Sequence, residues 1–259
     1  MAAIHIGKPW PLGACPTRRG VNFSLVAPLA TRVELLLFAN GEASEPELVV
    51  PLDGQHRSGD YWHVEVEGAG IGSCYGYRVY GPLQPGGHGF NPSKVLLDPC
   101  ARAIAGWASY RRGAAIGAVP NTASCLKGVV TERDCFDFEA APRPRHSWQR
   151  TVIYELHAGG FSRGAGCPVP KERQGRLLGL IDTLPYLQEL GVTTLELLPV
   201  MAFDPQDAPA GRQNHWGYSP LSWMAPHPDY LIGDDPLEAR RQVRQLVSAC
   251  HQAGIEVVL

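Results

Sequence analysis

Residues 214–228 read Asn-His-Trp-Gly-Tyr-Ser-Pro-Leu-Ser-Trp-Met-Ala-Pro-His-Pro, and the rest of the chain is organised around them. The prolines and the glycine exclude a regular helix or a central strand, so we expect a rigid loop. The rings of Trp216, Tyr218 and Trp223 would then form a platform for a flat, partly apolar ligand such as a pyranose ring. The alternative is that these aromatic side chains only fill a small satellite core.

The sequence on both sides of this loop alternates between strand and helix patterns. Residues 152–157 and 194–200 read as strands, and residues 181–190 carry leucine and isoleucine at helical spacing. Gly191 follows directly and supplies the left-handed residue with which helices often end. Strands and helices in alternation predict a parallel sheet with crossover helices.

A second helix is expected after the loop. Asp235 is its N-cap, Pro236 occupies its first helical position, and Glu238 completes a capping box. Gly254 ends it, and the residues that follow form a third, apolar strand. The loop between the second strand and this helix, residues 201–234, is far longer than such connections usually are, and long loops of this kind are normally functional.

Residues 20–80 show a different pattern, of short apolar or alternating runs separated by turn residues such as Asn40-Gly41. The clearest strands are residues 21–26, 33–38, 61–66 and 74–80. This pattern predicts a β sandwich. Trp62 and Tyr77 fall within these strands among apolar neighbours, so we expect them in the core and not on a sugar-binding surface.

Residues 106–150 are expected to form a connector, because periodicity fades there into Gly-Ala-rich and Pro-Arg stretches. The arginines of its last part are interrupted by prolines, so we interpret them as a solvated face. The sequence therefore predicts two folded parts, residues 1–105 and residues 151–259.

Composition and charge exclude several classes of partner. Apolar residues make up 44% of the chain, and 23 Lys and Arg stand against 25 Asp and Glu. No charge field of one sign argues for nucleic acid or an anionic membrane, so we expect a neutral partner. The N-terminus lacks the apolar core of a signal peptide, and no run approaches the about 20 apolar residues of a spanning helix. We therefore expect a cytoplasmic protein.

Seven cysteines occur, at positions 15, 74, 100, 125, 135, 167 and 250. Their number is odd, their spacing is wide, and they form no Cys-x-x-Cys pair, which argues against a disulfide framework and against a zinc site. We expect buried thiols without a catalytic role.

Residues 214–220 resemble the Asn-Tyr-Trp-Gly-Tyr-Asn-Pro segment of the isoamylase-type glycogen debranching enzymes, in the α-amylase superfamily (glycoside hydrolase family 13). Tyr-Glu-Leu-His at 154–157 is similar to that family's first barrel strand, and Leu-Glu-Leu-Leu-Pro-Val at 195–200 is similar to its second. Gly-Ile-Glu-Val-Val-Leu at 254–259 looks like the start of its third, where the family continues into Asp-Val-Val-x-Asn-His.

The N-terminal part resembles the family-48 carbohydrate-binding module that precedes the barrel in debranching and branching enzymes. The matching segments are residues 11–14 (Pro-Leu-Gly-Ala), 20–24 (Gly-Val-Asn-Phe-Ser), 75–82 (Tyr-Gly-Tyr-Arg-Val-Tyr-Gly-Pro) and 90–99 (Phe-Asn-Pro-Ser-Lys-Val-Leu-Leu-Asp-Pro). Some members of that module family bind glucan, and others only form a wall packed on the barrel.

These resemblances imply an immunoglobulin-like β sandwich over residues 1–105. They also imply the first part of a (β/α)8 TIM barrel over residues 151–259, truncated at strand 3. In the family, the tyrosine that matches Tyr218 stacks on the sugar bound just before the scissile bond. The implied substrate-binding residues are Tyr218, Trp216, His157 and His215. His215 stands where the family usually has tyrosine, and Ala-Gly-Gly at 158–160 replaces its Val-Arg-Gly.

The activity that the resemblance implies for the parent enzyme is hydrolysis of α-1,6-glucosidic branch linkages in glycogen or a related α-glucan. Retaining glycosidases need two carboxyl groups roughly 5 Å apart. The family carries its nucleophilic aspartate after strand four and its acid glutamate after strand five. We therefore expect no catalytic residue in this chain, and we expect the chain alone to be inactive. A complete barrel takes about 250 residues, so we expect a truncated product, a gene fragment or a partial gene model.

Four carboxylates have other interpretations. Glu155 and Glu196 lie on strands with apolar neighbours, and we interpret them as buried hydrogen-bonding partners. We interpret Asp204 and Asp207 as solvated or turn-capping residues, because no dense alternation of oxygen ligands surrounds them. Calcium is therefore not indicated, and no cofactor is expected.

Two alternative functions stay open. The chain could be a non-catalytic glucan-binding or interaction protein, or a fragment of a related branching or trehalose-forming enzyme. The segments at 75–82 and 96–99 lean toward the debranching side, and the sequence indicates no oligomeric state. The third strand should present an apolar free edge, so we expect residues 151–259 to be poorly soluble or partly ordered, whereas residues 1–105 should fold alone.

Overall fold

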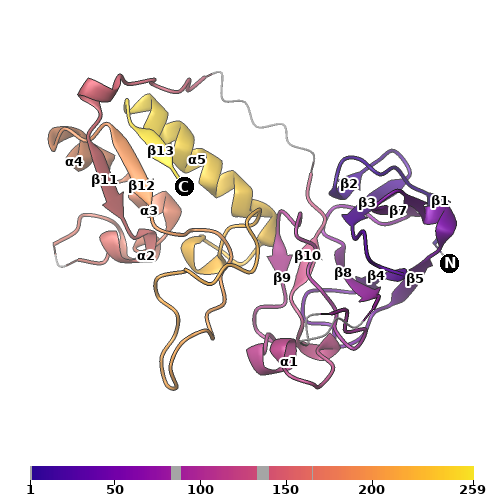
Figure 1. Cartoon of the computed structure of the whole chain (residues 1–259). Coiled ribbons are helices and arrows are strands. Elements are labelled where there is room, and N and C mark those ends of the chain that lie inside the picture. Colours follow the sequence, from indigo (N-terminus) through magenta and orange to yellow (C-terminus); the bar gives the residue numbers. More distant parts are fainter. Residues whose placement is uncertain (1, 83–88, 133–139, 165) are drawn as a thin grey trace. The chain divides into compact units, whose positions relative to one another are not determined.

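The computed structural model describes residues 2–82, 89–132, 140–164 and 166–259. The chain divides into two compact units, Met1–Arg133 and Asp134–Leu259 (Figure 1). The strands of the first unit pair antiparallel, and those of the second pair parallel and alternate with helices. Among the described helices, none has the length and apolarity that a membrane crossing requires.

The first sheet of the N-terminal unit runs in the order β1-β7-β3-β2, with the short β6 also paired to β7. Its strands are β1 Ile4–Ile6, β2 Gly13–Pro16, β3 Gly20–Val26, β6 Arg57–Ser58 and β7 Tyr61–Glu67. β3 and β7 pair along their whole length, with Gly20 opposite Glu67 at one end and Val26 opposite Tyr61 at the other. The structure confirms the strands predicted over residues 21–26 and 61–66.

The second sheet runs in the order β5-β4-β8-β10-β9. Its strands are β4 Arg32–Phe38, β5 Leu48–Leu52, β8 Cys74–Tyr80, β9 Ile104–Ala105 and β10 Lys127–Val129. β4 and β8 confirm the strands predicted over residues 33–38 and 74–80. β10 lies inside the range 106–150, which the sequence predicts to be a connector. The prediction missed this strand because three residues are too few to show alternation.

Side chains from the two sheets meet in one core. Phe23 of β3 and Tyr75 of β8 pack edge to face, with their ring centroids 5.0 Å apart. Trp62 and Tyr77 are almost completely buried in this core, which confirms their prediction as core residues. The indole N–H of Trp62 donates to the Ala27 carbonyl over 3.1 Å, so its polar atom is satisfied inside the core.

The second sheet is covered on both of its faces. Leu35 and Leu36 are adjacent in β4 and therefore point to opposite faces, yet both are fully buried. Leu35 belongs to the core between the sheets, whereas Leu36 packs in a second cluster with Val95 and Cys125. The segments around Val95 and Cys125 thus form an outer layer on this sheet.

Two buried lysines connect this outer layer to the rest of the unit by hydrogen bonds. Lys127 is fully buried, and its Nζ donates to the carbonyls of Gly41 (2.7 Å) and Cys125 (3.2 Å). Lys94 is also buried, and its Nζ donates to the carbonyl of Ala114 (2.6 Å) in α1, Arg112–Ile116. A buried ammonium group is unfavourable unless hydrogen bonds compensate for lost water, and here backbone carbonyls supply them.

The described cysteines are free thiols, and four of them are buried as expected: Cys15, Cys74, Cys125 and Cys250. Cys100 and Cys167 are half-buried, and Cys135 lies outside the described residues. Burial raises the pKa of Cys250 to about 12. A thiol with such a pKa is not a nucleophile near neutral pH.

The second unit is built on a parallel sheet in the order β11-β12-β13. Its strands are β11 Ile153–Leu156, β12 Thr194–Leu197 and β13 Glu256–Val258. Its helices are α2 Ala158–Phe161, α3 Leu177–Ile181, α4 Leu184–Glu189 and α5 Ala239–Gln252. The strand and helix alternation predicted from the sequence is confirmed.

One face of this parallel sheet is covered, and the other is open. Leu195 of β12 points to the covered face and packs in one cluster with Leu180 of α3 and Leu246 of α5, and all three are fully buried. The opposite face is open at Ile153, which is 52% exposed, and at Val258, which is 44% exposed, whereas Thr194 and Glu256 on the same face are buried. Parallel sheets are ordinarily covered on both faces, so the open face is unusual.

The helix predicted over residues 181–190 is divided into α3 and α4. Thr183 lies between them, and its hydroxyl donates to the Leu180 carbonyl over 2.7 Å. Pro185 in the first turn of α4 has no N–H with which to continue the earlier helix. Gly191 follows α4 with a φ of 83°, which confirms the predicted left-handed stop.

α5 begins one turn later than predicted, because Pro236–Glu238 forms a 3₁₀ turn before it. The Asp235 carboxylate accepts a hydrogen bond from the Leu237 N–H over 2.9 Å, which confirms its role as a cap. The Glu238 carboxylate pairs with Arg241 over 3.3 Å and not with the Asp235 N–H, so the predicted capping box is wrong.

We expect a fragment ending at residue 132 to be a stable sandwich and one ending at residue 105 to be much less stable. The shorter fragment lacks β10 and leaves one edge of β8 unpaired. It also lacks the buried side chains of Val129 and Val130, and full burial of one valine contributes about 1.5–3 kcal/mol. Thermal unfolding followed by circular dichroism should give the shorter fragment a clearly lower Tm. Equal Tm values would place the boundary of the sandwich near residue 105.

Candidate functional site

The long loop after β12 folds back on itself at the end of the strand. It is closed by two antiparallel bridges: Met201 with Pro226 and Phe203 with Pro220. The Ala202 N–H donates to the Ala225 carbonyl over 2.8 Å, and the His227 N–H donates to the Val200 carbonyl over 2.9 Å. These bonds hold the segment 214–228 near the carboxyl end of β12.

Asp204 organises the base of this loop. Its carboxylate is buried and accepts from the Gln206 N–H over 2.9 Å, and its carbonyl accepts from the Asn214 amide over 3.2 Å. Asp204 therefore caps a turn, which confirms one of its two predicted roles, and it is not solvated. The Asp207 carboxylate accepts from the Ser219 hydroxyl. Over the described part of the chain, no group of three or more His, Cys, Asp or Glu side chains is placed to hold a metal ion.

Gly217 allows the loop to pack tightly on the strand end. Its φ is 83°, in the region that favours glycine. A Cβ at this position would lie 3.1 Å from Pro199 and 3.1 Å from the Phe203 ring. The backbone at 217 thus sits against the end of β12, while its neighbours Trp216 and Tyr218 project outward.

Three aromatic side chains of the loop are exposed to solvent. Trp216 is 58% exposed, Tyr218 67% and Trp223 71%, and we call this set the aromatic platform. The alternative interpretation, in which these rings fill a satellite core, is wrong for this structure. The loop holds them by backbone bonds and not by burial of the rings.

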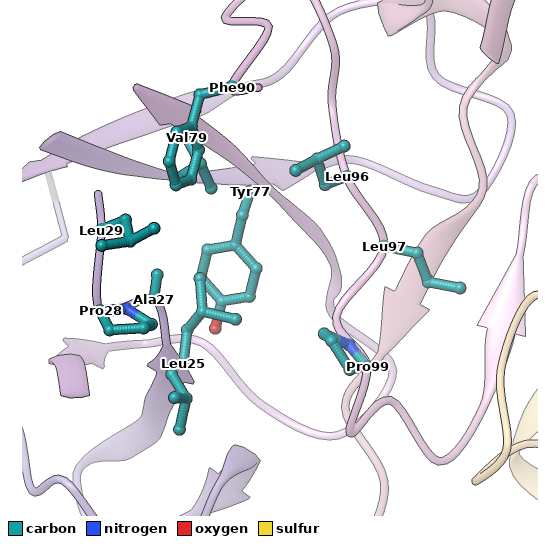
Figure 2. Close-up of a pocket in the computed structure, with 11 residues that line it drawn as sticks. Leu25, Ala27, Pro28, Leu29, Tyr77, Val79, Phe90, Leu96, Leu97 and Pro99 are labelled. Carbon is teal, nitrogen blue, oxygen red and sulfur yellow. The ribbon is translucent and has the colours of Figure 1, made fainter. Parts of the chain in front are cut away.

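A cavity of about 340 Å³ in the sandwich contrasts with this site, because it is almost entirely apolar. Figure 2 shows the Tyr77 ring between Leu25 and Ala27 on one side and Leu96 and Leu97 on the other. Among the residues that line it, only Tyr77 carries a polar side-chain atom, and that hydroxyl is buried. Such a wall offers no hydrogen-bonding groups to sugar hydroxyls, so we do not place a glucan there.

A second cavity, of about 540 Å³, lies between the aromatic platform and the parallel strands. Tyr218 and Trp223 line it from the loop, and Glu155 and Glu196 line it from β11 and β12. Trp216 is not among the lining residues. The cavity thus combines two aromatic rings with two carboxylates at the carboxyl ends of parallel strands, which is the edge where ligands of β/α folds bind.

Glu155 and Glu196 are directly opposite each other in the register of β11 and β12. Their prediction as buried hydrogen-bonding partners is wrong, since Glu155 is exposed and Glu196 is half-buried. That prediction assumed a parallel sheet covered on both faces. Both side chains are on the open face, where they reach the cavity.

His157, at the end of β11, connects the strand to the loop. Its Nε2 lies 2.8 Å from the carbonyl oxygen of His215, and the two imidazole rings are 4.2 Å apart at 30°. Trp216 and Tyr230 meet the His157 ring edge to face, with centroids 6.1 Å and 5.9 Å away. Burial lowers the pKa of His157, and the His215 carbonyl partly offsets this effect.

The structure therefore divides the four predicted substrate-binding residues. Tyr218 lines the cavity, whereas Trp216, His157 and His215 form a ring cluster beside it. Their role in binding substrate stays a prediction. His157 and His215 are 58 residues apart in sequence, and only the folded loop brings them together.

His227 belongs to the same loop, and the sequence alone does not predict its role. It is buried, and its ring stacks on Phe203 with a centroid distance of 3.8 Å and an angle of 13°. Its Nδ1 accepts from the Asp229 N–H over 3.2 Å. Burial lowers the pKa of His227 to about 4, although the nearby Asp229 acts in the opposite direction. The prolines on either side, Pro226 and Pro228, are the one sequence signal of a fixed position.

Residues 11–101 match the family described as carbohydrate-binding module 48, the isoamylase N-terminal domain. The matched range contains β2 to β8 and the segment up to residue 101. This match confirms the resemblance of the N-terminal part to that module.

Several solved structures share the fold of almost the whole chain. The catalytic module of the multi-modular glycogen-degrading pneumococcal virulence factor SpuA has a TM-score of 0.73 and 20% identity, over 98% of this chain and 37% of that one. The Group B Streptococcus pullulanase SAP, in complex with maltotetraose, has a TM-score of 0.72 and 23% identity, over 96% and 33%. A Paenibacillus barengoltzii pullulanase in complex with maltohexaose and alpha-cyclodextrin has a TM-score of 0.68 and 22% identity, over 97% of this chain and 38% of that one. The chain thus spans about a third of the length of these proteins.

We expect the second unit to lose stability as the pH falls from 6.5 toward about 4. His227 has an ordinary pKa of 6.5 and a pKa of about 4 in the folded chain, so folding disfavours its protonated form. The contribution of the neutral ring is complete above pH 6.5 and is lost as the pH falls to the folded value. It amounts to roughly 3 kcal/mol of unfolding free energy.

Urea unfolding of the wild type and of His227→Asn, at about pH 7 and about pH 4.5, measures this contribution. Asparagine keeps an acceptor for the Asp229 N–H but does not titrate. The variant should therefore show a smaller fall in unfolding free energy between the two pH values. An equal fall in both proteins would contradict the assignment of this pH dependence to His227.

Proposed function

We propose that this chain is the N-terminal part of an isoamylase-type, glucan-debranching glycosidase of the α-amylase superfamily. The observation that carries the proposal is the pair Tyr218 and Trp223, two exposed rings that line a cavity at the carboxyl end of a parallel β/α sheet. In β/α barrels, this end is where substrates bind. The match of residues 11–101 and the fold shared with a glycogen-degrading module and with pullulanases support the same assignment.

On this proposal, residues 151–259 are the first part of a (β/α)8 TIM barrel, with β11, β12 and β13 as its first three strands. Their order in the sheet is their order in the sequence, as in a barrel. The open face that carries Ile153 and Val258 would be the barrel interior, and the remaining strands would cover it. The share of the solved structures that the chain spans is in keeping with this.

The proposed ligand is an α-glucan. Pyranose rings present apolar faces that stack on aromatic rings, and Tyr218 and Trp223 offer such surfaces in the cavity. The carboxylates of Glu155 and Glu196 would accept hydrogen bonds from sugar hydroxyls at the floor of the same cavity. The chain has a formal net charge of −2, so binding would rest on stacking and hydrogen bonds and not on a field of one sign.

We assign Glu155 and Glu196 to binding and not to catalysis. Hydrolysis by a retaining mechanism needs one carboxylate to attack the anomeric carbon and another to protonate the leaving oxygen, from positions that flank the glycosidic bond. Glu155 and Glu196 are opposite each other on neighbouring strands and approach the cavity from the same sheet face. On this proposal, the nucleophile and the acid for α-1,6 hydrolysis would come from other strands of the barrel.

We expect Tyr218→Ala to weaken the binding of amylopectin by about tenfold, because a lost aromatic stacking contact is worth about 1.5 kcal/mol. Affinity electrophoresis of the chain in amylopectin gels measures this change. In a protein carrying a complete barrel, the same substitution should lower kcat/KM by an order of magnitude, since Tyr218 would align the reacting sugar.

Trp148→Ala is the matched control for this substitution. Trp148 is 87% exposed and belongs to the same unit, but it does not line the cavity of Tyr218. Its replacement should leave the mobility in amylopectin gels unchanged. If both variants weakened binding equally, or neither did, Tyr218 would have no special role in glucan binding.

We expect the 259-residue chain to release no reducing ends from glycogen, amylopectin or pullulan. Glu155→Gln and Glu196→Gln should leave this blank level unchanged and affect only glucan binding. A reducing-sugar assay on the three proteins measures the outcome. Turnover above the blank that either substitution abolishes would mean that these two carboxylates are catalytic after all.

These two assays also separate the proposal from a non-catalytic glucan-binding protein. That second candidate is favoured by one observation, the match of residues 11–101 to a carbohydrate-binding module. If the sandwich fragment alone binds amylopectin as tightly as the whole chain, and Tyr218→Ala changes nothing, binding by the module is the better account. If Tyr218 contributes, the second unit carries a glucan site of its own.

A further inference from the structure

The contact between His157 and His215 fixes the tautomer of the neutral His157 ring. A carbonyl oxygen only accepts hydrogen bonds, so the Nε2 of His157, 2.8 Å from the His215 carbonyl, must carry the proton. The Tyr230 hydroxyl oxygen lies 3.3 Å from the same Nε2 and accepts a second, weaker hydrogen bond from it. The neutral ring therefore has its lone pair on Nδ1.

The Nδ1 of His157 is buried and has no hydrogen-bond partner among the described residues. Protonation of the ring would place a new N–H at this buried position without an acceptor, which is unfavourable. The positive charges that act on the ring from neighbouring elements are those of Arg163, which follows α2, and of His215 when it is protonated. The hydroxyl of Tyr230 is the remaining ionisable group in contact with it. No compensating carboxylate acts on the ring from the described residues.

The ring contact is continuous with the aromatic platform. His215 directly precedes Trp216, whose ring meets His157 and His215 edge to face at 6.1 Å and 5.8 Å. Tyr218 lies two residues further, beyond the tightly packed Gly217. Only Trp216 and Gly217 separate His215 from Tyr218, so the position of His215 would act on Tyr218 through these two residues.

Gly159 lies against the rings of His157 and Tyr230 and leaves space for both of them. A Cβ at that position would lie 3.0 Å from His157 Cε1 and 3.0 Å from Tyr230 Cε1. A side chain at this position would therefore require one or both rings to shift by a few tenths of an ångström. Gly159 and His215 are two of the positions at which this chain departs from the motifs of the resembling family, and both lie next to the His157 ring.

We propose that His157 and His215 form a pH-sensitive latch that positions the aromatic platform, closed when His157 is neutral and released when His157 is protonated. In this latch, His157 and His215 act as positioning residues, through the loop that carries the aromatic platform. The latch rests on the proposed function, because it regulates access of the glucan to Tyr218. It predicts that glucan binding weakens in mild acid while the sandwich stays folded.

Hydrogen exchange on peptides that cover residues 214–224 tests the latch without any glucan. In the wild-type chain, exchange at about pH 5 should be at least about fivefold faster than at about pH 7 after correction for intrinsic rates. His157→Gln keeps an N–H donor of similar reach but does not titrate, so its corrected rates should change clearly less between the two pH values than those of the wild type. His227 is present in both proteins, and its contribution cancels in the comparison.

His215→Phe is the second variant. It keeps a ring against His157 and the backbone carbonyl, but it removes the second imidazole charge, so its response to pH should be smaller than that of the wild type. An equal response to pH in the wild type and in His157→Gln would overturn the latch. If His157→Gln fails to fold, an NMR titration of His157 in the wild type decides: a midpoint equal to that of an unfolded peptide of the same sequence overturns it.

Amylopectin affinity at the same two pH values then separates the latch from the proposed function. The ratio of affinities at about pH 7 and about pH 5 should be at least about fivefold in the wild type and clearly smaller in His157→Gln. If neither protein binds amylopectin at neutral pH, the proposed glucan function fails, whereas the exchange result still decides the latch. If both bind and their ratios are equal, the latch fails and the glucan site stands.

Discussion

A parallel sheet buries both of its faces, and this requirement governs the second unit. The strands β11, β12 and β13 have helices on one face, where Leu195 and Leu246 are fully buried. The other face is exposed at Ile153 and Val258, although Thr194 and Glu256 on it are buried. The open face is the reason that Glu155 and Glu196 reach a cavity and not a core. The partial cover on this face thus exposes the side chains on which the candidate site depends.

The sandwich could be predicted from the sequence where its strands are long enough to alternate. β3, β4, β7 and β8 each have seven residues, and their predicted limits agree with the structure to within one residue. β9 and β10 have two and three residues, too few for a periodic signal, and they are held in place by contacts distant in sequence, such as the bond from Lys127 to Gly41. One predicted helix is divided into α3 and α4 because of Pro185. The prediction gave more weight to the regular spacing of leucines than to this proline.

The candidate site was predictable in its parts but not in its arrangement. The exposure of Trp216, Tyr218 and Trp223 follows from a loop rich in proline and glycine, and the position of that loop follows from the preceding strand. The stacking of His157 on His215 depends on how the loop folds back, which no local pattern records. The buried His227 is a further case, because a histidine between two prolines gives no indication of the Phe203 ring against which it packs.

The two lysines buried in the sandwich have a consequence for the chemistry of the whole chain. Their Nζ atoms donate to backbone carbonyls and are shielded from solvent. An electrophile in solution therefore cannot reach these amines while the sandwich is folded. The other lysines in the sequence, Lys8 and Lys171, are exposed. An acylating reagent added to the folded protein would mark Lys8 and Lys171 and would reach Lys94 and Lys127 only in molecules whose sandwich had opened. The extent of acylation at Lys94 and Lys127, relative to that at Lys8 and Lys171, would therefore measure how often the sandwich opens.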